Sequence, residues 1–114
     1  MLSENDGTYI LRRCFTDAGL RVQEDYAMTV ADKTIRLDGF DAERKIGFEY
    51  LSHEANDRAE LTCDVIAELE AKMQRGELYV LLIDEDEVDS AATLERAAQH
   101  FLSVLRSRGR LPSS

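Results

Sequence analysis

The sequence predicts an α/β fold with elements in the order α-β-β-β-α-β-α, arranged as a three-layer sandwich around a mixed sheet. Three observations lead to this prediction. Apolar residues recur at helical spacing in three separate stretches, two strand-like runs flank a short polar turn, and a continuous apolar run lies between two of the helical stretches. Strands joined by a tight turn pair antiparallel, whereas a strand entered through a helix usually pairs in parallel. We therefore expect both pairings in one sheet.

The first helix and the first strand have clear apolar patterns. Helical spacing connects Ile10, Leu11, Cys14, Phe15 and Ala18, and Gly19 follows as a C-terminal stop. Residues 21–30 then alternate, with Val22, Tyr26, Met28 and Val30 as the apolar members. This alternation predicts a half-buried strand, which Ala31-Asp32-Lys33 turns back.

The second and third strands are TIRLDGF, residues 34–40, and KIGFEYL, residues 45–51, joined by DAER. If the turn centres between Glu43 and Arg44, Asp38 lies directly opposite Glu49. Opposed residues have Cβ atoms about 5 Å apart, so their carboxylates would repel unless a cation or a proton lies between them. A shift of one residue would separate them.

The second half of the chain predicts helix, strand and helix. Asp57 and Glu60 have the spacing of a capping box, and Gly76 ends the helix that follows. The stripe that we expect this helix to bury is Leu61, Val65, Leu69 and Met73. The run LYVLLI, residues 78–83, is typical of a strand covered on both faces, and Ser90 can cap a final helix. The inner face of that helix is Leu94, Ala97, Ala98, Phe101 and Leu105.

Length and composition favour one domain, which we expect to cover residues 1–109 before a loose tail at 110–114. The chain has 114 residues, of which 44% are hydrophobic. No apolar run approaches the ~20 residues of a membrane-spanning helix, and the start MLSENDG is unlike a signal peptide. Cys14 and Cys63 stand far apart, which indicates reduced, mostly buried thiols in a cytoplasmic protein.

The formal net charge of −9 disfavours nucleic acid as a partner. Nucleic-acid binders usually present a basic stripe that replaces phosphate counterions, but here 23 acidic residues face 14 basic ones. Arg106, Arg108 and Arg110 form only a short basic stretch. With no membrane segment either, the expected partner is another protein or a second copy of the chain.

The element order, with Asp38 near the end of the second strand and Glu49 on the third, resembles the core of the restriction-endonuclease-like, or PD-(D/E)xK, nuclease superfamily. The resemblance covers residues from about 8 to 84. In that superfamily an Asp in the first place and a (Glu/Asp)-x-Lys pattern in the second hold a divalent metal. The resemblance therefore implies that Asp38 and Glu49 are catalytic residues and metal ligands, with Mg²⁺ or Mn²⁺ as the cofactor.

The chain departs from this pattern at Leu51, where the superfamily has the lysine that positions or activates water. Lys45 lies on the same strand, but four residues separate it from Glu49 by roughly 13 Å. Lys72 is near the far end of its helix, whereas His53 and Arg58 are nearer. Without the lysine we lean against an enzyme.

Ordinary structural roles compete with each of these site assignments. Asp38 and Glu49 are also explained as a solvated sheet face without a ligand. The acidic run at 84–89 fails the EF-hand template, because Val88 and Asp89 occupy its fifth and sixth positions, and is better explained as a strand-to-helix turn. His53 and His100 have no partner histidine at metal-ligand spacing.

Three functions remain. The first is a small non-catalytic domain with a degenerate nuclease-like fold that acts through protein contacts. The second is a metal-dependent phosphodiesterase or nuclease that uses Asp38 and Glu49. The third is an acidic binding protein similar to secretion chaperones, which are small, acidic and built in a comparable order. The first is favoured by Leu51 and by the acidic composition.

Overall fold

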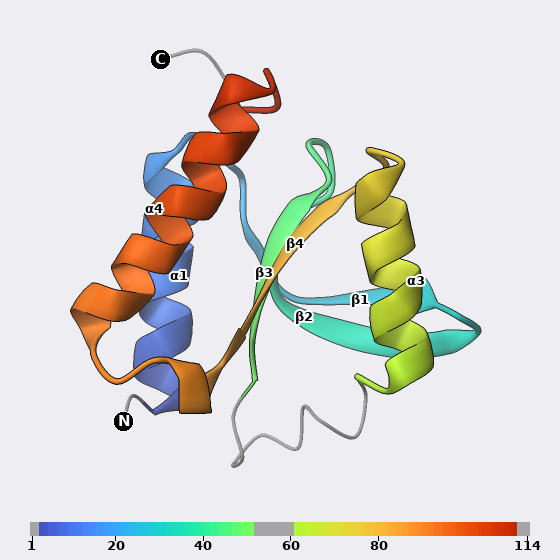
Figure 1. The fold of residues 1–114 in the computed structure, drawn as a ribbon, viewed down its shortest axis with the longest axis horizontal. Coiled ribbons are helices and arrows are strands. Elements are labelled where there is room, and N and C mark those ends of the chain that lie inside the picture. The colour runs from blue at the N-terminus through green and yellow to red at the C-terminus, as the bar shows by residue number, and fades with distance from the viewer. Residues whose placement is uncertain (1–2, 52–60, 112–114) are drawn as a thin grey trace.

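The computed structural model of the protein describes residues 3–51 and 61–111, and within them the fold is α/β (Figure 1). The helices and strands follow in the predicted order. They are α1 (Glu4–Asp17), β1 (Gln23–Val30), β2 (Lys33–Asp41), β3 (Ile46–Leu51), α3 (Cys63–Gln74), β4 (Tyr79–Asp84) and α4 (Ala91–Ser107), with a 3₁₀ turn, η1 (Glu85–Glu87), before the last helix.

The four strands form one mixed sheet in the order β1-β2-β3-β4. The β1–β2 and β2–β3 pairs are antiparallel, and β3–β4 is parallel. Helices α1 and α4 lie on one face of the sheet and α3 lies on the other (Figure 1). The predictions of a mixed sheet, of a parallel fourth strand and of helices on both faces are confirmed.

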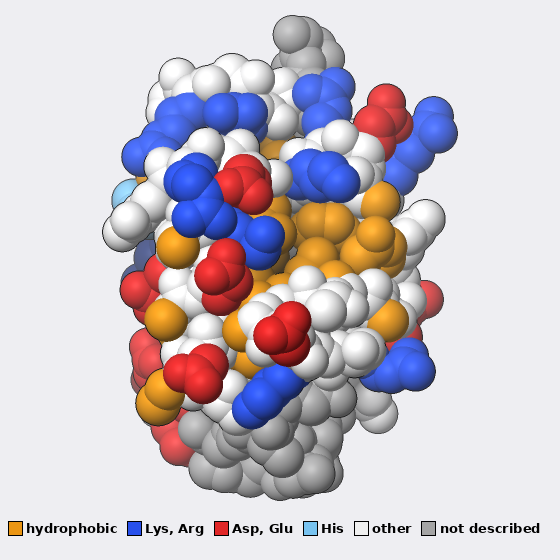
Figure 2. Space-filling model, turned by 90° about the vertical axis from the view of Figure 1, so that its right-hand side faces the viewer, with side chains coloured by type: hydrophobic (Ala, Val, Ile, Leu, Met, Phe, Trp, Pro, Cys, Tyr) orange, Lys and Arg blue, Asp and Glu red, His pale blue; other side chains and the backbone are white. Residues whose placement is uncertain are grey.

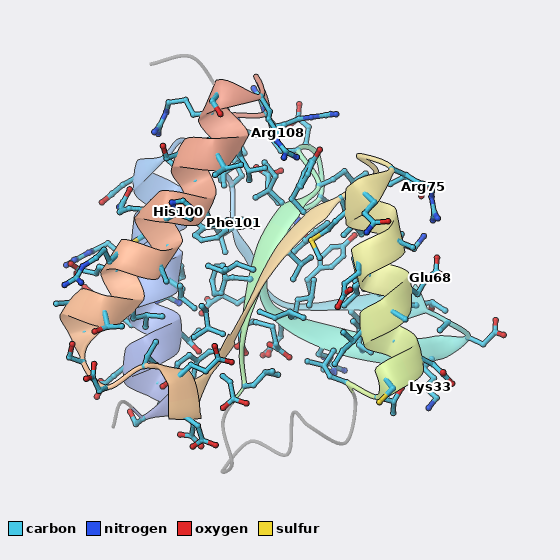
Figure 3. All side chains as sticks on the ribbon, viewed as in Figure 1. Lys33, Glu68, Arg75, His100, Phe101 and Arg108 are labelled. Atoms are coloured by element: carbon cyan, nitrogen blue, oxygen red, sulfur yellow. The ribbon has the colours of Figure 1, made fainter. Side chains whose placement is uncertain are left out.

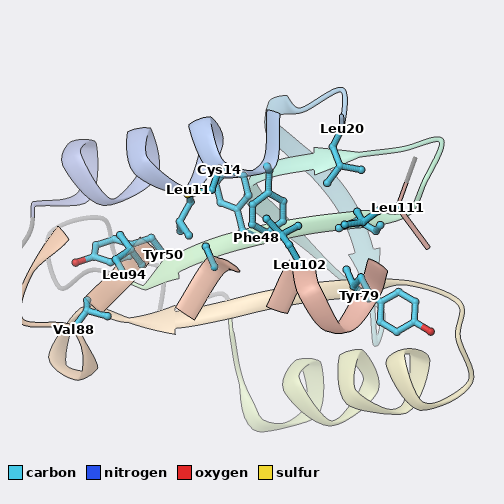
Figure 4. Packing of buried hydrophobic residues seen from close by; sticks show 14 residues of the cluster. Leu11, Cys14, Leu20, Phe48, Tyr50, Tyr79, Val88, Leu94, Leu102 and Leu111 are labelled. Carbon is cyan, nitrogen blue, oxygen red and sulfur yellow. The ribbon is translucent and has the colours of Figure 1, made fainter. Parts of the chain in front are cut away.

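Two apolar cores fill the spaces between these layers. Large side chains of β3 pack with Leu11, Phe15 and Leu102 of α1 and α4 (Figure 4). On the other face, Val65 and Leu69 of α3 pack against β2. The predicted stripe is buried at Leu61, Val65 and Leu69, which are 7%, 0% and 0% exposed.

Short polar side chains cap α1, α3 and α4 at their N-termini. The Ser3 hydroxyl accepts the Asp6 N–H at 3.2 Å, and Ser90 does the same for Thr93 at 3.2 Å, as predicted for the last helix. For α3 the cap is Thr62, whose hydroxyl accepts the Val65 N–H at 3.4 Å. The capping box expected of Asp57 and Glu60 lies outside the described residues.

Two expectations about the ends and the thiols need correction. Leu111 is 7% exposed and belongs to the core beside α4, so residues 110 and 111 are not a loose tail. Both cysteines are free thiols, but only Cys14 is buried, whereas Cys63 is exposed at the start of α3. Cys63 lies on a different face of α3 from the buried residues Val65 and Leu69, so the helix does not bury it.

The pairing of β1 with β2 is distorted at Asp25 and Asp38, next to the residue of β2 where its pairing with β3 begins, Gly39. Backbone pairing runs through Tyr26↔Leu37 and Glu24↔Gly39 but passes over Asp25 and Asp38. Leu37 and Phe40 belong to the same core although they are three residues apart, so strict alternation is interrupted between them. Asp25 has a φ of 50°, in the left-handed region. Asp38 therefore lies where β2 bends.

Candidate functional site

Asp38 and Glu49 lie opposite each other, as the predicted register requires. The β2–β3 pairing ends at Gly39↔Phe48, which makes Asp38 and Glu49 the next opposed positions. Side chains continue the pairing there. The Asp38 N–H donates to Glu49 Oε1 at 3.0 Å, and the Tyr50 N–H donates to Asp38 Oδ2 at 2.7 Å. The two carboxyl groups therefore connect the strands where the backbone ladder stops.

Glu49 is a buried acid. It is 1% exposed, and Asp38 is half-buried. The interpretation of this pair as a solvated sheet face is therefore wrong. The reason is the place of β3, which has a strand on either side and helices on both faces of the sheet (Figure 1).

The environment of Asp38 favours its protonated form. Burial is the largest cause and raises the pKa of Asp38, and the charge of Asp25 adds to the rise. A side-chain hydrogen bond with Glu49 and the Tyr50 N–H act in the other direction. A hydrogen bond between two carboxyl groups needs a proton on one of them. A proton shared by the two carboxyl groups would relieve the repulsion expected of two opposed carboxylates.

A third acid, Asp25, joins this row, and sequence reasoning missed it. The β1–β2 register places Asp25 opposite Asp38, between the paired positions Glu24↔Gly39 and Tyr26↔Leu37. The sequence located the first turn at Ala31-Asp32-Lys33 but not its centre. In the structure Ala31 and Asp32 have φ values of 52° and 63°, as the two central residues of a type I′ turn require. Centring the first hairpin on these two residues gives the register.

A polar cavity of about 460 Å³ opens beside Asp38, between α1 and the bend in the strands. Its lining is Asn5, Thr8, Tyr9, Arg12, Glu24, Asp25 and Asp38. Arg12 and Glu24 form an ion pair across it. The Thr8 hydroxyl is buried without a hydrogen-bond partner among the described residues. The cavity can hold a polar ligand or water against Asp38, whereas Glu49 is not part of its lining.

The carboxyl pair lacks the other parts of a metal centre of the nuclease type. Among the described residues no three His, Cys, Asp or Glu side chains are placed to hold one metal ion. Leu51, two residues after Glu49, is half-buried. A divalent metal of the kind that the nuclease superfamily binds does not fit the described residues, because Asp38 and Glu49 bind backbone N–H groups and each other.

Neither Lys45 nor Lys72 lines the cavity beside Asp38. Lys45 and Lys72 line a separate cavity of about 230 Å³ that shares no residue with the one beside Asp38. Lys72 also lies 3.6 Å from a Glu77 carboxylate oxygen. His100 is exposed on α4 (Figure 3). His53 and Arg58 lie outside the described residues.

The acidic run after β4 forms a strand-to-helix turn, as predicted. The Asp84 carboxylate accepts the Asp86 N–H at 2.9 Å and caps η1. Glu85 is 5% exposed. The parallel register pairs Asp84 with Leu51 at the end of β3. Burial, and then the charges of Glu85 and Asp84, raise the pKa of Tyr50.

These contacts define an α/β protein with a buried carboxyl pair at the centre of a mixed sheet. In comparisons with protein-family models, with curated proteins and with solved structures, no match to the chain was found. Among the described residues, no helix combines the length and the apolar character needed to cross a membrane.

Proposed function

We propose that the protein is a small cytoplasmic domain with a degenerate nuclease-like fold, which is non-catalytic and acts through protein contacts. The environment of Glu49 is the observation that supports this most. Glu49 is 1% exposed, and its carboxylate accepts the Asp38 N–H at 3.0 Å. This supports a role in connecting two strands rather than in binding a substrate. Leu51 also supports a non-catalytic role, because its side chain has no proton or charge with which to activate an attacking water.

The outer edge of β4 is the surface that we assign to a protein partner. β4 ends the sheet, and no described strand pairs with its outer side. The Tyr79 N–H donates inward to the Lys45 carbonyl at 2.8 Å, so by alternation Val80 and Leu82 direct their backbone groups outward. Such an edge can accept an extended segment of another chain as an added strand.

The non-catalytic half of the proposal is tested by phosphodiester hydrolysis. Supercoiled plasmid and bis-(p-nitrophenyl) phosphate are incubated with the protein and Mg²⁺ or Mn²⁺. We expect no turnover above a protein-free control. Turnover that is present in the wild type and absent in Glu49→Gln would show a working catalytic pair and contradict the proposal.

The protein-contact half is tested by site-specific crosslinking in cells. A photoreactive benzoylphenylalanine replaces half-buried Leu82 on the β4 edge, and exposed His100 on α4 serves as the control position. We expect a discrete protein adduct from position 82 and none from position 100. The same result at both positions, or no adduct at either, argues against a partner on this edge.

One observation favours a second candidate, a metal-dependent phosphodiesterase. The 460 Å³ cavity brings Asp38 and Asp25 to solvent beside Arg12, a combination that can hold a cation and a phosphate together. In this case hydrolysis should depend on Asp25 and Asp38 rather than on Glu49. The assay above distinguishes the two candidates when Asp25→Asn is added.

A further inference from the structure

A second and larger cavity, of about 640 Å³, lies between the C-terminal ends of α3 and α4 at the start of β4. This volume is within the range of small-molecule sites. Apolar and aromatic side chains form much of its wall, namely Met73, Tyr79, Phe101 and Val104. Figure 3 shows Phe101 and Arg108 on the side of α4 that faces α3.

Two guanidinium groups at this cavity have no acidic partner among residues 3–51 and 61–111. Arg108 and Arg110 both line it and are exposed, and neither forms an ion pair within the described part of the chain. The Arg110 guanidinium carbon lies 5.5 Å from the centroid of the Tyr79 ring. Each guanidinium carries five N–H donors, so most of these donors are open to a ligand.

Arg75 differs from these two arginines although it also lines the cavity. Its guanidinium is bound by Glu77 and lies 3.4 Å from a Glu68 oxygen, and the Glu77 bond raises the pKa of Arg75. Figure 2 shows the face of the molecule that carries α3, on which basic side chains lie toward the upper part around a hydrophobic centre. Of the three arginines that line the cavity, Arg108 and Arg110 therefore carry charge that no acid in the described part of the chain compensates.

Helix dipoles do not account for this placement. Cations near the C-terminus of a helix are stabilised by its carbonyl groups, and this explains an arginine at the end of α4. Arg106 already occupies the last turn and does not line the cavity. In a chain of net charge −9, two further arginines without an ion pair to any described residue, at a cavity lined by aromatic rings, are available to an anionic ligand.

We propose that this cavity binds an organic anion, a phosphate monoester or a carboxylate attached to an aromatic or aliphatic body. The forked guanidinium groups of Arg108 and Arg110 match the oxygens of either anion. The body of the ligand packs on Tyr79, Phe101 and Met73. This site goes beyond the proposed function and does not depend on the Asp38–Glu49 pair or on the β4 edge.

The test uses phenyl phosphate as the probe, with inorganic phosphate and benzyl alcohol as its two halves. Binding is followed by calorimetry and by the amide NMR signals of Gly76 and Tyr79. We expect phenyl phosphate to bind at least about tenfold more tightly than either half, because each contact of ~1.4 kcal/mol contributes a factor of ten. A phosphotyrosine tetrapeptide is tested in the same way. If it binds more tightly than phenyl phosphate, the anion belongs to a polypeptide; if it binds more weakly, the anion belongs to a small molecule.

The matched variants are the double variant Arg108→Gln/Arg110→Gln and the control Arg106→Gln. We expect the double variant to lose at least about tenfold in phenyl phosphate affinity and the control to retain it. Arg108→Gln alone guards against misfolding, since the Arg108 side chain bonds to no described residue, and a thermal melt checks its fold. Equal losses in control and double variant, equal affinities for phenyl and inorganic phosphate, or no binding at all would each overturn the site.

Discussion

Asp41 and the Asp38–Glu49 pair are buried or half-buried acids of the same hairpin, but different groups surround their carboxyl oxygens. The Asp41 carboxylate accepts three N–H groups, from Arg21 at 2.8 Å, Glu43 at 3.0 Å and Arg44 at 2.9 Å. Asp38 and Glu49 each accept a backbone N–H across the strands and also bond to each other. Asp41 connects Arg21 to the turn after β2, whereas Asp38 and Glu49 connect β2 to β3 as a pair of adjacent carboxyl groups.

This difference matters for function. A carboxylate that accepts several backbone N–H groups of a turn has a structural role. A carboxyl pair is in addition sensitive to protons and cations. Predictions about unfolding free energies, pH and metal ions can separate the two cases.

We expect the largest loss of unfolding free energy from a substitution in the apolar core between α3 and the sheet. Leu69 is 0% exposed, so Leu69→Ala should lower the unfolding free energy by about 4 kcal/mol, as a core truncation that leaves a cavity. Urea denaturation measures this loss. Exposed Glu70 on the same helix provides the control Glu70→Ala, which should change stability by less than ~0.5 kcal/mol. A Leu69→Ala loss below ~1 kcal/mol would mean that the α3 stripe is not a packed core.

Removing the Asp41 carboxylate should have the next largest effect. Asp41→Ala removes the acceptor of three backbone N–H groups, two in the turn after β2 and one at Arg21, which should cost about 3 kcal/mol in urea denaturation. Asp41→Asn keeps one oxygen acceptor and should lose less. Equal stability of Asp41→Ala and wild type would remove the distinction between a structural acid and the paired acids.

Asp38 should make stability depend on pH in the direction opposite to an ion-paired acid. Its folded pKa is raised above the ordinary 3.8, so the folded state holds a proton that the unfolded state has released. The contribution of Asp38 to the unfolding free energy is fully present below pH 3.8 and is lost as the pH rises through the folded pKa. As the pH rises from 3.8 through the folded pKa, wild type should therefore lose stability relative to Asp38→Asn, as measured by urea denaturation at each pH. Parallel pH profiles would contradict the raised pKa.

The smallest expected effect is that of Glu49→Gln. The glutamine oxygen can still accept the Asp38 N–H while one negative charge is removed, so stability should be unchanged or slightly higher. Calorimetric melts with and without Mn²⁺ complete the test, because a ligand that binds only the folded state raises the melting temperature. We expect no Mn²⁺ shift in either protein. A shift in wild type alone would establish a metal site, and equal shifts in both would place the metal elsewhere.

The sequence by itself determined the element order, the hairpin register and most of the buried positions. These follow from local periodicity, from glycine and serine signals at helix ends, and from the turn at residues 42–45 that sets Asp38 opposite Glu49. A hairpin register is local, because a short turn fixes it before any distant contact forms.

Only the tertiary structure decided the burial of Glu49, the third acid in the row and the arginine cavity. Burial of Glu49 depends on strands and helices packed around β3, and Asp25 reaches Asp38 through a bend in two paired strands. Arg108 and Arg110 meet Tyr79 and Met73 because the ends of α3 and α4 converge on β4. Residues brought together from distant parts of the chain leave no periodic pattern in the sequence, since packing rather than local conformation places them side by side.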